Sequence, residues 1–248
     1  MQEEFVPVVE MLESECKEYF GERICTAYLH GSIDKQDAVY GISDLDYYLI
    51  LHDAIAPADI AWSQNTTKKL EKQFCSVDEV HLSIQWIEGL RDDPFTRFIL
   101  SHNATLRIGM PIEAVQESRG YVSFSPDKQL AKMRLGFARQ CFCDALHDKQ
   151  PACTGDLPEN LYYASRKLAR YFIVVEGAYF LMSRNIFSGF DKTCVLTGLK
   201  AEAPSFSCVL GMAESVLDDP VHAHIEPAKF LEEVRPLVEW MFEEIDRS

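Results

Sequence analysis

The sequence predicts an α/β (α+β) domain with a small mixed sheet over residues 1–120, followed by an all-α helical bundle domain over residues 121–248. Two observations support this division. Before residue 120, short segments rich in β-branched and aromatic residues alternate with helical segments. After Pro126, apolar residues recur at helical spacing and few segments resemble strands. The length of 248 residues is sufficient for two such domains.

The first expected elements are a helix and a strand. Apolar residues recur at steps of three and four between Phe5 and Phe20, with Pro7 near the start and Gly21 at the end. This spacing predicts an amphipathic helix. Residues 24–30 form a short segment that is partly β-branched and aromatic, so a strand is predicted there.

Three further elements follow in the first domain. Residues 46–51 are apolar enough for a central strand, and residues 57–74, which follow a proline-containing turn, are predicted to be helical. From residue 79 to residue 86, polar and apolar side chains alternate, which predicts a third strand with one solvated and one buried face. Glu79 and His81 fall on the solvated face.

The second domain is predicted to consist of helices. Segments of helical periodicity cover residues 127–148, 158–184, 191–199, 205–217 and 227–246. Two prolines and Gly155 mark residues 149–158 as a loop between the first two of these helices.

Composition limits the possible partners. The formal net charge of −15 argues against a nucleic-acid-binding surface and favours a cationic small molecule, or a phosphorylated ligand held through metal ions. Eight cysteines occur without a C-x-x-C pair, so we expect most of them to be reduced and buried. The chain begins without a basic and apolar leader and has no apolar run long enough to span a membrane. A cytoplasmic protein without a membrane partner is therefore expected.

The most informative motif joins the first two predicted strands. Gly31-Ser32 ends one strand, eleven residues intervene, and Asp44-Leu45-Asp46 begins the next strand. Strand residues two apart point to the same side, so both carboxylates are expected on one face, where Mg²⁺ would relieve their repulsion. Glycine lets the backbone approach a phosphate, to which the Ser32 hydroxyl can donate a hydrogen bond. These features together predict a site for a metal ion and a nucleotide.

This motif resembles the signature of the DNA polymerase β-like nucleotidyltransferase superfamily, in which Gly-Ser precedes Asp-hydrophobic-Asp on the next strand. Its sequence in this chain, Leu-His-Gly-Ser followed by Ser-Asp-Leu-Asp, looks most like that of the streptomycin/spectinomycin (aminoglycoside) adenylyltransferases. In the helical half, Lys167-Leu-Ala-Arg170 and a later Lys192 resemble that pattern in outline. The resemblance implies a nucleotidyltransferase domain followed by a helical domain, with ATP and drug bound between them.

The resemblance also implies a third carboxylate on the next strand, which completes the metal site or removes the proton from the attacking hydroxyl. Glu79 is our first choice, because it begins the third strand and shares a face with His81. An alignment shifted by two residues places His81 where the family has an acid, and the general base is then changed or missing.

Transfer of a nucleotidyl group also requires positive charge near the leaving pyrophosphate. Lys192, close to a predicted helix start, is the expected nucleotide-binding cation, with Lys167 and Arg170 as alternatives. Aromatic residues of the second domain could stack on an adenine or a drug ring, although such spacing usually reflects packing between helices. These residues are Tyr162, Tyr163, Tyr171, Phe172, Tyr179 and Phe180.

Three functions are compatible with these residues. The leading hypothesis is a nucleotidyltransferase that uses two Mg²⁺ ions to move AMP from ATP to a hydroxyl of a small, cationic acceptor such as an aminoglycoside. A second hypothesis replaces this acceptor with a protein side chain. A third, prompted by the ambiguity at His81, is a regulatory module that binds a nucleotide without catalysis.

Overall fold

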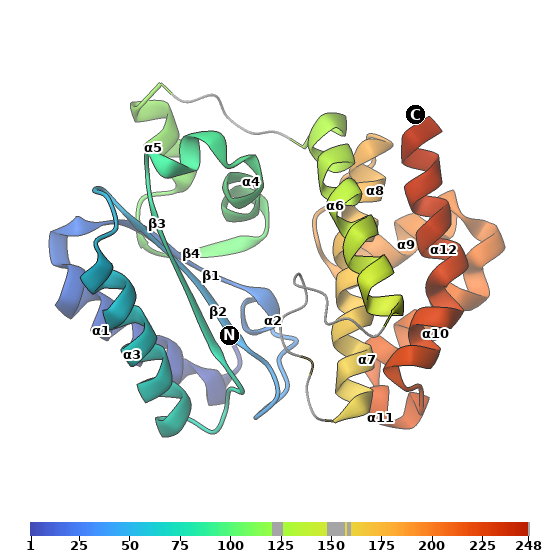
Figure 1. The fold of residues 1–248 in the computed structure, drawn as a ribbon, viewed down its shortest axis with the longest axis horizontal. Coiled ribbons are helices and arrows are strands. Elements are labelled where there is room, and N and C mark those ends of the chain that lie inside the picture. The colour runs from blue at the N-terminus through green and yellow to red at the C-terminus, as the bar shows by residue number, and fades with distance from the viewer. Residues whose placement is uncertain (121–125, 148–156, 158–159, 248) are drawn as a thin grey trace. The chain divides into compact units, whose positions relative to one another are not determined.

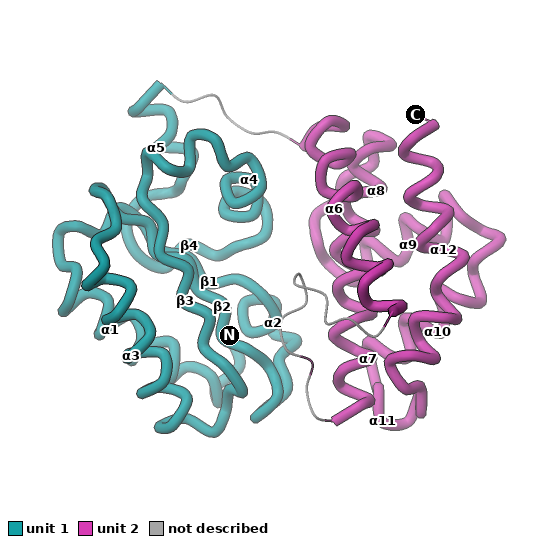
Figure 2. The backbone as a smooth tube through the Cα atoms, viewed as in Figure 1, with its two compact units in different colours: residues 1–125 teal, residues 126–248 magenta. Residues whose placement is uncertain are grey.

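The structure is a computed structural model that describes residues 1–120, 126–147, 157 and 160–247. The chain divides into two compact units, Met1–Ser125 and Pro126–Ser248 (Figure 2). The first unit contains a sheet and its covering helices, and the second unit is helical (Figure 1). This arrangement confirms the predicted fold class. The predicted domain boundary between residues 120 and 121 stays a prediction.

The first unit is built on a four-stranded mixed sheet with the order β3-β2-β1-β4. Strand β1 (Ile24–His30) is antiparallel to β2 (Leu45–Leu51) and to β4 (Ala104–Gly109), whereas β2 is parallel to β3 (Val80–Trp86). The end of β1 therefore meets the beginnings of β2 and β3 at one edge of the sheet. Both parts of the Gly-Ser and Asp-x-Asp motif lie at this edge.

One face of the sheet is covered by two long helices. Helices α1 (Val6–Phe20) and α3 (Pro57–Gln73) pack on this face (Figure 1). The odd-numbered residues of β2 enter the resulting core, and Leu45, Tyr47 and Leu49 are fully buried there. Burial of these side chains fixes the pleat of β2, so Asp46 must point to the opposite face.

The opposite face carries a smaller core, formed by elements that the sequence analysis did not predict. Helices α4 (Pro94–His102) and α5 (Ile112–Ser118) flank β4, and their apolar residues pack against Tyr28 and Ile50 of the sheet. Strand β4 was missed because it is a short edge strand. Its alternation of Leu106 and Ile108 with polar residues spans only six positions.

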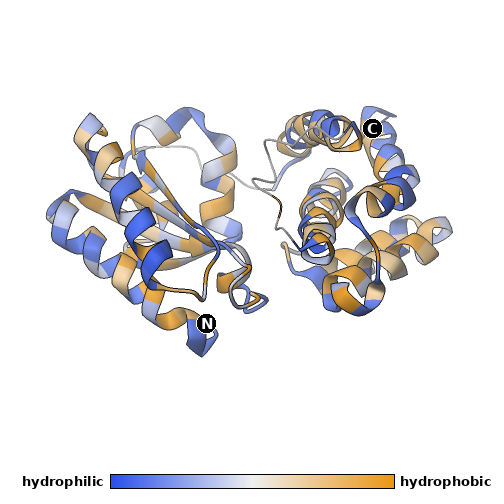
Figure 3. Cartoon of the chain, turned by 60° about the horizontal axis from the view of Figure 1, so that its bottom comes forward, coloured by the Kyte–Doolittle hydropathy of each residue, from blue (hydrophilic) through white to orange (hydrophobic). Residues whose placement is uncertain are grey.

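The second unit contains the predicted helices with shifted ends and additional short pieces. The helices are α6 (Lys128–Leu146), α7 (Leu161–Ala169), α8 (Glu176–Ser183), α9 (Lys192–Glu202), α10 (Ser207–Asp218), α11 (Pro220–Ala223) and α12 (Pro227–Arg247). Hydrophobic and hydrophilic residues both occur along these helices (Figure 3). Side chains of Asp127, Asn160 and Asp191 accept hydrogen bonds from the first turns of α6, α7 and α9, which explains where these helices begin.

Two expectations, one about this unit and one about the cysteines of the whole chain, need correction. The predicted helix 158–184 is not regular, because the π-helical segment Arg170–Val175 joins α7 to α8, and residues 158–159 lie outside the described part. Most cysteines were expected to be buried, yet the structure buries only Cys16, Cys25 and Cys141 among the seven that it describes. All seven are free thiols.

Within the described residues, no helix is both long and apolar enough to cross a membrane.

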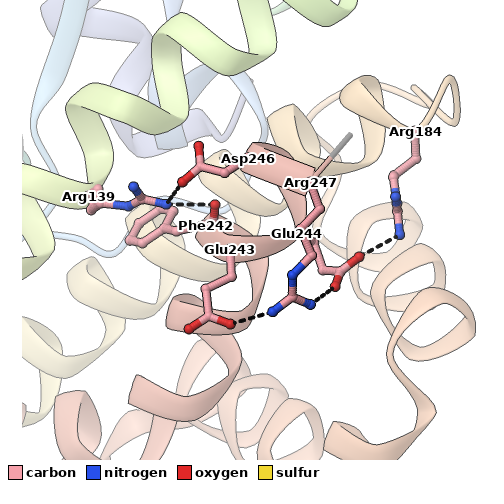
Figure 4. A network of polar contacts seen from close by, with 7 residues as sticks. All are labelled: Arg139, Arg184, Phe242, Glu243, Glu244, Asp246 and Arg247. Atoms are coloured by element: carbon pink, nitrogen blue, oxygen red, sulfur yellow. Dashed lines mark hydrogen bonds and ion pairs between the residues drawn. The ribbon is translucent and has the colours of Figure 1, made fainter.

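Polar contacts connect α12 to its neighbours at the surface of the second unit. Arg139 of α6 donates hydrogen bonds to the Phe242 carbonyl and to Asp246, at 2.6 and 2.9 Å, and Arg184 donates to Glu244 at 3.2 Å (Figure 4). These groups are partly solvated, so each pair contributes little to stability. Burial of the apolar side of α12 contributes more; its buried residues are Phe230, Leu231, Val234, Leu237, Val238, Met241, Phe242 and Ile245.

A charged pair also lies inside the second unit. The Arg134 guanidinium donates to Glu176 Oε1 from Nε at 3.0 Å and from Nη2 at 2.8 Å, and to the Tyr171 hydroxyl at 2.7 Å. Glu176 is fully buried, and its second oxygen, Oε2, has no hydrogen-bond partner. Burial raises the pKa of Glu176 to about 7, against the opposing attraction of Arg134.

Stability should therefore depend on the protonation of Glu176. Its folded-state pKa lies above the unfolded value, so its contribution to the free energy of unfolding is largest below about pH 4.5 and is lost as pH rises to about 7. The change is on the order of 3 kcal/mol. Urea unfolding at several pH values should show this slope in the wild type and lose it in Glu176→Gln. Equal slopes in both proteins would contradict the assignment.

Candidate active site

The site begins at the turn where β1 ends. Gly31 has φ +77°, a conformation that side chains disfavour, and it opens the short helix α2 (Gly31–Asp34). A Cβ atom at this position would collide with Oδ2 of Asp46. The Asp46 carboxylate therefore lies directly against the backbone of the turn. The structure thus brings together the two parts of the sequence motif, which are separated by a loop of eleven residues.

Asp46 lies in a row of polar residues that crosses the sheet. It pairs in register with His30 on β1 and with His81 on β3. On the other side of β1, His30 pairs in register with Ala104 of β4, where the polar residues end. Register partners on adjacent strands have neighbouring side chains on one face, so an aspartate stands between two histidines.

Backbone hydrogen bonds fix Asp44 relative to the start of β3. Leu45 N donates to the Glu79 carbonyl at 2.8 Å, and Asp78 N donates to the Ser43 carbonyl at 3.2 Å. The chain on either side of Asp44 is thus attached to the segment that carries Glu79. This parallel pairing explains how Glu79 comes to lie beside Asp44.

A compact cluster results from this pairing. His81 Nε2 lies 3.3 Å from Glu79 Oε2 and 3.9 Å from Asp44 Oδ2. Ligand atoms of the three residues all lie within 4.8 Å of one another. The expectation that Glu79 and His81 share a face agrees with this geometry, and both residues adjoin Asp44. Their catalytic roles stay predictions.

His30 is a site residue that the sequence analysis did not single out. Its ring stacks on Tyr48 with centroids 4.8 Å apart. Burial lowers the pKa of His30 below its usual value, whereas the nearby Asp46 carboxylate opposes this shift. The lowered pKa favours a neutral imidazole at pH 7. The available signal was its position, one residue before Gly31 at the end of a strand.

The residues at this edge fit a divalent cation. Asp44, Glu79 and His81 provide two carboxylates and an imidazole at mutual distances suitable for one ion, and Asp46 adds a carboxylate against Gly31. That Asp44 and Asp46 hold the ion stays a prediction from the motif. Ser32 lies in α2, immediately after Gly31, where its hydroxyl and nearby N–H groups could reach a phosphate.

The predicted cations lie in the second unit. Lys192 is the first residue of α9 and forms an ion pair with Asp218. Lys167 belongs to α7, and Arg170 begins the π-helical segment. A role for Lys192 or its alternatives in nucleotide binding stays a prediction.

Of the six aromatic residues considered as ligand-stacking groups, three are buried in the core of the second unit, and Tyr162, Tyr163 and Tyr171 are half-buried. Phe172, Tyr179 and Phe180 are buried. Phe172 meets Phe142 with ring centroids 5.0 Å apart, and Tyr179 packs against Phe190. This agrees with packing between helices as the usual meaning of their spacing.

Comparison with known proteins agrees with this architecture. No family model matches the sequence, and no curated protein matches it. Among solved structures, the chain is similar to a spectinomycin adenyltransferase from Enterococcus faecialis determined with ATP and spectinomycin, with a TM-score of 0.54. The similarity covers 97% of this chain and 98% of that chain at 10% sequence identity. This chain therefore shares the fold of an adenyltransferase over nearly its whole length.

Proposed function

We propose that this protein is a metal-dependent nucleotidyltransferase that moves AMP from ATP to a hydroxyl of a small, cationic acceptor such as an aminoglycoside. The proposal depends above all on the convergence of Gly31, Asp44, Asp46 and Glu79 at one edge of the sheet. It is supported by the fold shared with an adenyltransferase whose structure was determined with ATP and spectinomycin.

The chain's own residues suggest how the reaction proceeds. The acceptor hydroxyl attacks the α-phosphorus of ATP, and pyrophosphate leaves with the bonding electron pair. Asp44 and Asp46 would hold Mg²⁺, which neutralises phosphate charge and lowers the proton affinity of the hydroxyl. Gly31, which lacks a Cβ, lets the Asp46 carboxylate lie against the turn. Glu79 would accept the proton of the attacking hydroxyl.

Charge favours a cationic acceptor. The chain carries a formal charge of −15, and the proposed site combines the carboxylates of Asp44 and Glu79 with that of Asp46, which lies against Gly31. Amine groups entering such surroundings gain attraction that offsets part of their loss of hydration. The acceptor must be attracted to the carboxylates and must offer a nucleophile. An amine-rich drug with free hydroxyls does both.

The proposal is tested by measuring pyrophosphate release from ATP in the presence of Mg²⁺ and a panel of aminoglycosides. We expect release that depends on one or more acceptors, with the product shown by mass spectrometry to carry AMP. ATP with Mg²⁺ should also raise the melting temperature, because ligand bound only by the native state stabilises it. EDTA should cancel the effect.

Other outcomes would replace the proposal. A nucleotide-induced rise in melting temperature without turnover would support a non-catalytic module, which the position of His81 between Val80 and Leu82 makes a specific alternative. AMP attached to a protein instead of a drug would indicate a protein acceptor. If ATP with Mg²⁺ neither stabilises the protein nor releases pyrophosphate, the assignment of a nucleotide site is overturned altogether.

A further inference from the structure

The cluster at the start of β3 differs from an all-carboxylate ion site, because it contains an imidazole. One nitrogen, His81 Nε2, faces both Glu79 Oε2 at 3.3 Å and Asp44 Oδ2 at 3.9 Å. An ion placed among these three atoms would therefore have a nitrogen ligand.

The distances suit a single ion. An octahedral ion with bonds of about 2.1 Å places neighbouring ligand atoms about 3 Å apart. The three ligand atoms lie within 4.8 Å of one another, so small side-chain rotations are enough to surround an ion. Their side chains are 16% (Asp44), 43% (Glu79) and 39% (His81) exposed, which allows an ion to enter from solvent.

The backbone holds these donors in place. Glu79 and His81 are two residues apart at the beginning of β3 and project on the same side. Leu45 N donates to the Glu79 carbonyl, which fixes Asp44 beside them. Because the positions come from strand pairing, the donor set exists before an ion binds.

The donor types decide which ion fits. Mg²⁺ prefers oxygen ligands and loses its water reluctantly, whereas divalent transition-metal ions accept both imidazole and carboxylate. We propose that the Asp44–Glu79–His81 cluster binds a divalent transition-metal ion in preference to Mg²⁺. Two carboxylates and a neutral imidazole balance the charge of one such ion.

This inference deepens the proposed function, because a role of the bound ion in catalysis rests on the protein being a nucleotidyltransferase. The Mg²⁺ that accompanies ATP needs only oxygen ligands from the protein and the phosphates, and Asp44 and Asp46 can supply the carboxylate oxygens. The second ion would be held by the protein alone. Glu79 would then be an ion ligand, the ion would lower the proton affinity of the acceptor hydroxyl, and the hydroxyl proton would pass to solvent water.

The test uses the full chain without nucleotide, with Mn²⁺ and Mg²⁺ as probes. Calorimetry should show Mn²⁺ binding at least about tenfold more tightly than Mg²⁺. Pulsed electron paramagnetic resonance of bound Mn²⁺ should show modulation from a coordinated ¹⁴N nucleus. His81→Asp should abolish that modulation and shift the preference towards Mg²⁺. His52→Asp, at an exposed position beyond the other end of β2, is the matched control and should change neither result.

The electron paramagnetic resonance spectrum of the wild type with bound Mn²⁺ tests for a nitrogen ligand even if His81→Asp fails to fold. Absence of nitrogen modulation, or equal affinity for Mn²⁺ and Mg²⁺, would overturn the inference. Pyrophosphate release separates it from the proposed function. Turnover by a protein whose bound Mn²⁺ shows no nitrogen ligand would refute only the metal assignment. Nitrogen-coordinated Mn²⁺ in a protein that releases no pyrophosphate would refute only the transferase.

Discussion

Asp46→Asn should reduce adenylyl transfer by at least about 100-fold while leaving the metal-free fold as stable as the wild type or slightly more stable. The amide keeps the shape of the side chain but is a poor ligand for a divalent ion. Stability should not fall, because the change removes one negative charge at an edge of the sheet where Asp44 and Glu79 also contribute carboxylates. Asp44→Asn should behave in the same way. Transfer rates and urea unfolding of metal-free protein provide the two measurements.

An exposed carboxylate next to the site provides the control. Asp78 directly precedes Glu79 in the chain and is exposed. Asp78→Asn removes the same charge without changing Asp44, Asp46 or Glu79, so transfer should stay within about twofold of the wild type. If Asp46→Asn retains near-normal transfer, or unfolds in the absence of metal, the site assignment fails.

Gly31→Ala should impair both activity and stability. The new methyl group would collide with Oδ2 of Asp46, and alanine would have to adopt φ +77°. The backbone conformation costs about 1–2 kcal/mol, and displacement of the carboxylate adds to this cost. Because Asp46 is expected to hold the ion, we expect adenylyl transfer to fall by at least about tenfold beyond any loss of folded protein. Unfolding measurements and transfer assays on the folded fraction would test this.

Gly120→Ala separates the two effects. Gly120 also has a positive φ, +69°, but a Cβ at this position would meet nothing within 4 Å. The control should therefore lose stability through backbone strain while retaining activity. Adding Asp46→Ala to Gly31→Ala removes the clash but not the strain, so part of the lost stability should return. Equal losses of activity in Gly31→Ala and Gly120→Ala would show that the contact with Asp46 has no catalytic consequence.

The sequence was informative where a signal is local. Alternation of polar and apolar residues in β3 put Glu79 and His81 on one face, and the structure places both beside Asp44. The spacing of apolar residues in α1, bounded by Pro7 and Gly21, located the helix correctly. Weak or irregular local patterns were less reliable. The six residues of β4 gave no clear signal, and the helical periodicity of 158–184 concealed the π-helical segment Arg170–Val175.

By itself, the sequence determined the fold class, the order of the main elements and the motif that joins Gly31 to Asp46, because side-chain spacing and glycine conformation are properties of neighbouring residues. Only the tertiary structure decided which strands pair and in what register. Antiparallel β1 and parallel β3 place His30 and His81 on either side of Asp46. Contacts between residues distant in the chain depend on the packing of the whole sheet, so the local patterns could not show that Asp46 lies between His30 and His81.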